Sequence, residues 1–283
     1  MDFLRRLLPI IALLLSANGP LSAQEMLQRT AASVGEAYVA AAPLSSPAAC
    51  VNPAQYARLG ARLRLSADVV IPYGLPDLKM GTFAFSYAFK PLALSAVVCS
   101  NGNDDSRLSS FGGGFARLFG RKDAFSASVG IHYFALVHNL TSSGISTASS
   151  FSRLGFALHP SPSWTLTFCI QNPEARFITY SSHLTPIQQS WWAAVRWTGS
   201  SIFAFVAEVQ KDYDRAHLSS VVGRGAVCVR PYLGLFFTAG FCSRRGTLSA
   251  SAGYDWKLWG VRASISHDAQ LGPSGAAALE FHL

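Results

Sequence analysis

The chain has 283 residues, of which 50% are hydrophobic and only 13% are charged, against about 25% charged in an ordinary soluble domain. Its net charge of +8 comes from basic residues scattered singly, without a basic helix or an aromatic binding motif, which excludes a typical nucleic-acid-binding protein. After the first 20 residues no apolar run approaches the roughly 18 residues of a transmembrane helix, so a helical membrane protein is also excluded.

Residues 1–23 have the form of a secretory signal peptide. Arg5 and Arg6 precede the apolar run 7–15, and small residues lead up to Ala23. The apolar run is too short for a membrane anchor. We therefore expect export and cleavage near Ala23, which lowers the net charge from +8 to +7 because Arg5, Arg6 and Asp2 are removed.

Segment 24–59 differs from the rest of the chain because small residues dominate it and prolines interrupt it. Its length is sufficient to lie inside or beneath a barrel, so we predict an N-terminal hatch, a plug segment of the domain that follows. A disordered leader is the alternative, since small residues alone do not prove burial.

From residue 60 onward a two-residue period recurs, as expected for strands with one apolar face. In "GTFAFSYAFK" the bulky Phe83, Phe85, Tyr87 and Phe89 alternate with small residues, and "SWTLTFCIQ" and "LSASAGYDW" repeat the pattern. About fourteen such segments occur, each close to the nine to eleven residues that cross a bilayer as a tilted strand. They are 60–70, 81–90, 92–99, 111–119, 124–136, 151–159, 163–171, 190–198, 201–211, 220–229, 232–242, 247–257, 258–267 and 275–283.

Two all-β architectures use so many amphipathic strands. A soluble sandwich would expose charged residues, but the non-apolar faces here are mostly Ser, Thr, Gly and Ala. A closed membrane barrel turns the bulky set to lipid and the small set to the lumen, and it leaves no unpaired backbone in hydrocarbon. We predict a transmembrane antiparallel β-barrel of about fourteen strands over 60–283, in the outer membrane of a Gram-negative bacterium and in contact with its lipid. A secreted all-β domain is the alternative.

The small face of the predicted strands carries charged and polar residues that would lie in the lumen. They suit ion pairs that hold a hatch or stiffen the wall, or, if unpaired, an anion-attracting pore. The other lumen-phase residues are mostly small, with Ile202, Val206 and Phe236 as apolar exceptions. The charged and polar set is Arg62, Arg64, Asp68, His132, Arg153, Glu208, Arg224, Asp255, Arg262 and Glu280.

No pattern in the sequence indicates an enzyme, a metal or a cofactor. A G-x-S-x-G elbow and an H-E-x-x-H pair are both missing from the sequence. The five cysteines are widely spaced and lack C-x-x-C or His pairing, so we interpret them as isolated small apolar side chains instead of zinc ligands or disulfides.

The stretch "SVGEAYVAAAPLSSPAACVNPAQYARL" resembles the start of the FadL-like outer-membrane barrels, in the branch that holds PorV and PorQ of the type IX secretion system. The matching hatch motif is Gly35 followed by Asn52, Pro53 and Ala54. A proline-restricted turn with an asparagine that caps neighbouring amides would fix a plug against a barrel. "LTFCIQNPEARFITYSSHLTPIQQSWWAAVRW", with Asn172 and Pro186, and "FAFVAEVQKDYDR", with an inward Glu208, resemble later parts of the same branch.

The resemblance implies two candidate functions. The PorV and PorQ branch implies a non-enzymatic accessory of protein secretion that binds translocon or cargo proteins. FadL implies passage of hydrophobic small molecules across the outer membrane through a lateral opening beside the hatch. An apolar lumen pocket would distinguish them, and the few apolar lumen-phase residues favour the secretion accessory.

Overall fold

A computed structural model provides the structure of the protein. The predicted signal peptide and Arg62 lie outside the residues that it describes. The described residues are 30–44, 51–58, 63–121, 124–141, 144–180, 183–213 and 221–283.

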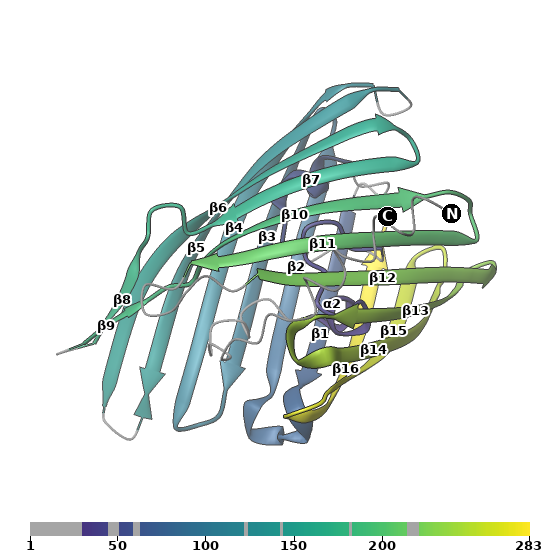
Figure 1. The fold of residues 1–283 in the computed structure, drawn as a ribbon. Helices are drawn as coiled ribbons and strands as arrows, with labels where there is room; N and C mark the ends of the chain where they lie inside the picture. The colour runs from purple at the N-terminus through teal and green to yellow at the C-terminus, as the bar shows by residue number, and fades with distance from the viewer. Residues whose placement is uncertain are drawn as a thin grey trace.

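Within these residues, fourteen antiparallel strands close into one barrel, and pairing of the first strand with the last completes the ring. A separate two-stranded hairpin, β8–β9, belongs to the connection from β7 to β10 and projects at the loop end of the barrel (Figure 1). The predicted all-β barrel of about fourteen strands is therefore confirmed. The barrel strands are β1 Leu63–Ile71, β2 Met80–Phe89, β3 Leu92–Gly102, β4 Ser106–Gly120, β5 Ser126–Leu140, β6 Ile145–Ser161, β7 Trp164–Gln171, β10 Gln189–Thr198, β11 Phe203–Tyr213, β12 Val221–Tyr232, β13 Leu235–Cys242, β14 Thr247–Asp255, β15 Trp259–Asp268 and β16 Gly272–His282.

The remaining elements are short. The hairpin consists of β8 Phe177–Tyr180 and β9 His183–Pro186, and the helical turns are α2 Ala31–Gly35, η2 Pro53–Arg58, η3 Pro72–Gly74, η4 Pro76–Leu78 and η6 Arg244–Gly246. No helix among the described residues is long and apolar enough to span a membrane.

The alternation of side chains follows the sequence pattern. On β2, Phe83 is 51% exposed on the outer face, whereas Ala84 and Ser86 are fully buried on the inner face. The same outer face carries exposed aliphatic and aromatic residues on most of the other strands. Such an outer band suits contact with lipid, as expected for a barrel that spans a membrane.

The two ends of the barrel differ. At the turn end, where β1 begins and β16 ends, the connections are short, and Trp164 packs against Trp197 with a centroid distance of 6.4 Å. At the loop end the connections are longer and include 172–188. Strands β4, β5 and β6 extend well beyond their predicted lengths toward this end, to 15, 15 and 17 residues. Most of their extra residues are polar, so they lack the regular alternation of bulky and small residues on which the prediction depended.

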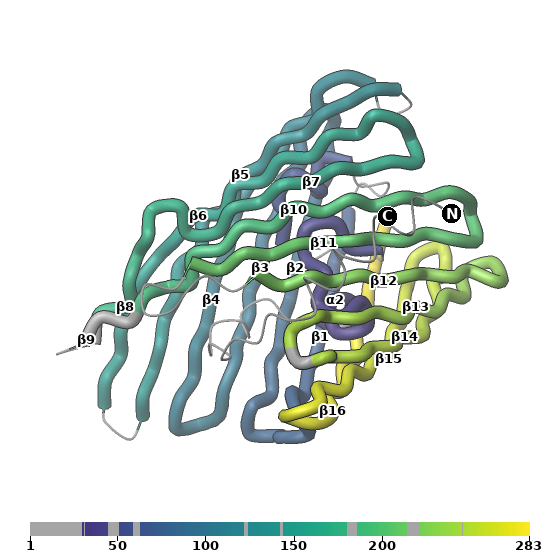
Figure 2. The backbone as a smooth tube through the Cα atoms, viewed as in Figure 1, coloured from purple at the N-terminus to yellow at the C-terminus, as the bar shows by residue number. Residues whose placement is uncertain are grey.

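The N-terminal elements lie inside the ring of strands, where Figures 1 and 2 show α2 enclosed by the walls. Thr30 and Ser33 cap α2 reciprocally, and the helix contacts β14, β15 and β16, while η2 contacts β4, β5 and β6. This segment needs small residues because the space between it and the barrel wall is narrow. A Cβ on Gly35 would collide with the Ser251 side chain of β14.

Candidate functional site: the hatch and the loop-end mouth

A carboxylate on the wall contacts residues 30–44, the first described part of the segment that we predicted to be a hatch and refer to by that name below. Glu208 on β11 accepts hydrogen bonds through one oxygen from the backbone amides of Ala40 (2.9 Å) and Ala41 (2.6 Å). Its other oxygen forms an ion pair with Arg224 on β12 at 3.0 Å. Both side chains are buried, and hydrogen bonds to an ionised acceptor are stronger than neutral ones. The pair therefore binds the hatch as well as the two strands.

The hatch motif anchors the second half. Asn52 accepts a hydrogen bond from the Ala54 amide (3.0 Å) and donates to the carbonyls of Phe156 (3.2 Å) and Phe168 (3.4 Å) on β6 and β7. Pro53 then begins η2. The asparagine thus links the turn to two wall strands.

Arg153 connects the hatch with the wall and the loop end. Its guanidinium donates to the Val51 carbonyl (3.4 Å) and to the side chain of Gln171, which itself donates to the Gln188 carbonyl (3.2 Å). The same guanidinium lies 4.8 Å from the ring centroid of Phe134. One side chain therefore contacts the plug, the end of β7 and the aromatic group described next.

An apolar cluster, which we call the mouth, is buried inside the barrel near the loop end, and at most 6% of any of its residues is exposed. Phe134 and Phe151 stack with a centroid distance of 5.0 Å, and Phe134 meets the ring of His132 edge-on at 5.6 Å. His132 stacks on Tyr56 of η2 at 5.2 Å and hydrogen-bonds to Ser95. Aromatic side chains thus form a continuous row from the mouth to the hatch. The cluster at the mouth consists of Phe134, Leu136, Phe151, Ile178 and Ile187.

Several residues of this cluster were missed by the sequence analysis. Phe134 and Leu136 lie at the end of the predicted strand 124–136 and continue its lumen phase, but the sequence analysis did not count them among the apolar lumen residues. Ile178 and Ile187 belong to the connection 172–188, which carried no strand prediction. Ile202 was predicted to face the lumen and is instead 54% exposed in the turn before β11. The low apolar content assigned to the lumen was therefore wrong.

The other predicted lumen residues differ in their surroundings. Asp68 accepts a hydrogen bond from Ser66 (3.4 Å), and Arg262 lies 4.8 Å from the ring centroid of Phe236. Arg64 and Glu280 are half-buried, whereas Asp255 is exposed at the end of β14. A buried ion pair that the sequence analysis missed joins Asp212 to Arg244 at 3.1 Å.

Strand β7 ends at a turn where its ladder with β6 stops, and β8 continues alongside β6 beyond that point. Asn172 has a left-handed backbone, with φ of 51°. Its amide still donates to the Ser152 carbonyl on β6 (2.8 Å), but its own carbonyl accepts from Ala175. The carboxylate of Glu174 accepts from the Ser152 amide instead (3.1 Å). Glu174 thus takes the position of the missing strand carbonyl.

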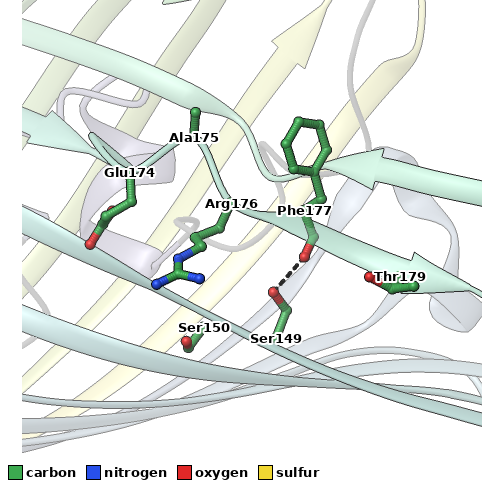
Figure 3. Close-up of a pocket in the computed structure, with 7 residues that line it drawn as sticks. All are labelled: Ser149, Ser150, Glu174, Ala175, Arg176, Phe177 and Thr179. Carbon is green, nitrogen blue, oxygen red and sulfur yellow. Dashed lines mark hydrogen bonds between the residues drawn. The ribbon is translucent and has the colours of Figure 1, made fainter.

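A pocket of about 600 Å³ lies beside this turn, between β6 and the segment that leads into β8 (Figure 3). Ser149 donates across it to the Phe177 carbonyl (2.7 Å), and the side chains of Glu174 and Arg176 point toward β6 (Figure 3). The pocket is lined by Ser149, Ser150, Glu174, Ala175, Arg176, Phe177 and Thr179.

In the part of the chain that the structure describes, no group of three His, Cys, Asp or Glu side chains could hold a metal ion. The four described cysteines, Cys99, Cys169, Cys228 and Cys242, are free and buried.

No protein-family model and no curated protein matches the sequence. Solved structures do match the fold. The CymD monoaromatic hydrocarbon channel is 12% identical with a TM-score of 0.65, over 91% of this chain and 98% of CymD. The Ralstonia pickettii toluene transporter TbuX is 13% identical with a TM-score of 0.62, over 90% and 98%. A Pseudomonas aeruginosa FadL homologue is 11% identical with a TM-score of 0.59, over 89% and 98%. The chain thus has the fold of FadL-like barrels.

Proposed function

We propose that this protein is an outer-membrane channel that carries hydrophobic small molecules past its hatch. The observation that carries the proposal is the apolar cluster at the loop-end mouth, from which aromatic rings lead to Tyr56 in the hatch. Pockets for apolar ligands are lined mainly by hydrophobic and aromatic side chains. The channels and transporters among the similar structures support the same function and give no support to an enzyme.

The fold also supports an outer-membrane location. Its outer face is apolar, and short turns at one end with longer loops at the other are typical of outer-membrane barrels. By that rule the turn end is periplasmic and the loop end extracellular, so the aromatic mouth would receive molecules from outside the cell.

The secretion-accessory hypothesis is less well supported. It was favoured because few apolar residues were assigned to the lumen. The structure instead buries Phe134, Leu136 and Phe151 together inside the barrel. None of the three structures compared above is described as a secretion protein. Co-purification with a secretion translocon from solubilised outer membranes would restore this hypothesis.

Uptake of a radiolabelled hydrocarbon tests the proposed function. Cells that lack their own hydrocarbon channel would express the wild-type protein, the Phe134→Ala variant or the Phe151→Ala variant. Toluene uptake would then be measured for each. We expect uptake with the wild type and a severalfold loss with both variants. Phe111→Ala is the matched control, because Phe111 is 51% exposed on the outer face and should leave uptake unchanged. Uptake no faster than in cells without the protein would contradict the proposal.

A further inference from the structure

A groove of about 590 Å³ lies on the outer face of the barrel over β11, β12 and β13, which are neighbours in the wall (Figure 1). These strands are hydrogen-bonded to one another along it, so the groove is a depression in the lipid-facing surface and not a hole through the wall. Its lining includes six residues in the outward phase of the three strands: Phe203, Phe205, Gly225, Val227, Ala239 and Phe241.

The groove exists because side chains are small or missing along β12 and beside it. Gly225 presents no side chain to the outside, and the residue opposite it on β11 is Ala207. The next outward position of β12 toward the loop end is Gly223. Bulky rings border this floor, since Phe241 lies opposite Gly225 on β13 and Phe205 precedes Ala207 on the same face of β11. The result is a trough with an apolar floor and aromatic sides.

The barrel itself does not require the glycine at position 225. A Cβ there would meet only the Val206 carbonyl oxygen at 3.6 Å, which is an ordinary van der Waals contact. The inward Gly130 and Gly240 differ, because a Cβ on either would collide with the hatch. Gly225 therefore leaves room outside the barrel, and a glycine within a strand often marks the close approach of a ligand.

A cation stands on the loop-end side of the groove. Lys211 is in the outward phase of β11, four residues beyond Ala207 and thus about 14 Å along the strand. Its ammonium lies 5.2 Å from the ring centroid of Tyr213, which accepts a hydrogen bond from Trp191 (3.3 Å). Tryptophan and tyrosine of this kind mark the boundary between hydrocarbon and water. Within the described part of the chain Lys211 forms no ion pair, so its charge is available to an anion.

We propose that this groove binds one anionic membrane lipid, with an acyl chain over Gly223 and Gly225 and the head group at Lys211. The occupant follows from the surroundings, because the groove is continuous with the lipid-facing band. The spacing fits as well, since about 14 Å separates Lys211 from Ala207 and one leaflet of hydrocarbon is about 15 Å thick. The inference goes beyond the proposed function and requires only that the outer face contacts lipid.

Native mass spectrometry of the full chain, folded in a non-ionic detergent, tests the proposal. The probe is dioleoylphosphatidylglycerol, and the control lipids are zwitterionic dioleoylphosphatidylcholine and short-chain dihexanoylphosphatidylglycerol. Gly225→Leu fills the groove, and Gly113→Leu is its matched control, because a Cβ on Gly113 of the outer face also meets nothing within 4 Å. Lys211→Gln removes the cation, and Lys79→Gln removes an exposed loop-end cation outside the groove.

We expect one dioleoylphosphatidylglycerol to be retained by the wild type, Gly113→Leu and Lys79→Gln with equal affinity. Its affinity should fall about fivefold in Lys211→Gln and at least as much in Gly225→Leu. The wild type should hold both control lipids about fivefold more weakly, because one lacks the net charge and the other is too short to reach the groove. Heat-modifiable migration in gels verifies that each variant folds, and toluene uptake, which tests the channel separately, should be the same for all of them.

Four results would overturn the proposal. Equal retention of the probe by Gly225→Leu and the wild type would place the lipid elsewhere. Equal affinity of the wild type for the two dioleoyl lipids would show that Lys211 does not select the head group. Displacement of the probe by toluene would make the groove a hydrocarbon site. A dimer that Gly225→Leu converts to monomers would make the occupant a second copy of the chain.

Discussion

Glu208 on β11 and Arg224 on β12 stand opposite each other in the sheet register and form a buried ion pair of 3.0 Å. The carboxylate also accepts from the amides of Ala40 and Ala41 in the hatch. This one carboxylate therefore contacts both a cation of the wall and the backbone of the hatch.

Glu208→Gln should release the hatch. The substitution leaves Arg224 buried without its counter-charge, and breaking a buried pair in this way costs about 3 kcal/mol. Hydrogen exchange of the amides in 36–44 should accelerate by about 100-fold, while the strands remain protected. Asp104→Asn is the matched control, because it removes the exposed Asp104–Arg107 pair and such pairs contribute little. Equal exchange in both variants would contradict the anchoring role of Glu208.

Gly130→Ala should displace η2 from the wall. A Cβ at this position would lie 2.6 Å from the Pro53 carbonyl carbon and 2.7 Å from the Ala54 nitrogen, both of which are backbone atoms that cannot move aside alone. Overpacking of this kind costs about 1–3 kcal/mol. Thermal unfolding of the purified barrel should therefore begin at a lower temperature. Gly113→Ala on the outer face, where a Cβ meets nothing within 4 Å, should leave the transition unchanged.

The sequence analysis succeeded where one local pattern determines the structure. Alternation of bulky and small residues predicted the strands and their faces, because strand geometry places every second side chain on one side. It could not predict that Glu208 binds Ala40 and Ala41, since that contact joins parts of the chain 167 or more residues apart. The end of the β6–β7 ladder was also missed, because it depends on the left-handed backbone of Asn172 and on Glu174 replacing a strand carbonyl.

A charged residue on the outer face should destabilise the barrel only where it lies within the apolar band. Phe115 on β4 is 56% exposed in the middle of the strand, and Phe125 is 62% exposed in the turn before β5. Arginine on the lipid face near the bilayer midplane costs about 2–4 kcal/mol and little near the interface. In lipid vesicles, Phe115→Arg should lower the free energy of unfolding by that amount, and Phe125→Arg should have a small effect. Similar losses in both variants would show that the band is misplaced.

Acidification should weaken the contact between Glu174, in the turn after β7, and the Ser152 amide of β6. Partial desolvation raises the pKa of this carboxyl, but hydrogen bonds from Ser152 and the charge of Arg176 outweigh it, so the pKa is lowered from its ordinary value of 4.5. The folded state thus favours the ionised form, and its contribution to stability is present above pH 4.5 and lost as the pH falls through the lowered value.

The Ser152 amide reports this titration, because it donates directly to Glu174 (3.1 Å). Its NMR chemical shift should change with a midpoint below pH 4.5, and Glu174→Gln should abolish the change. A midpoint at or above 4.5 in the wild type would mean that desolvation dominates. The carboxylate would then be a poor substitute for the strand carbonyl, and the contact between β6 and the turn after β7 would be weak.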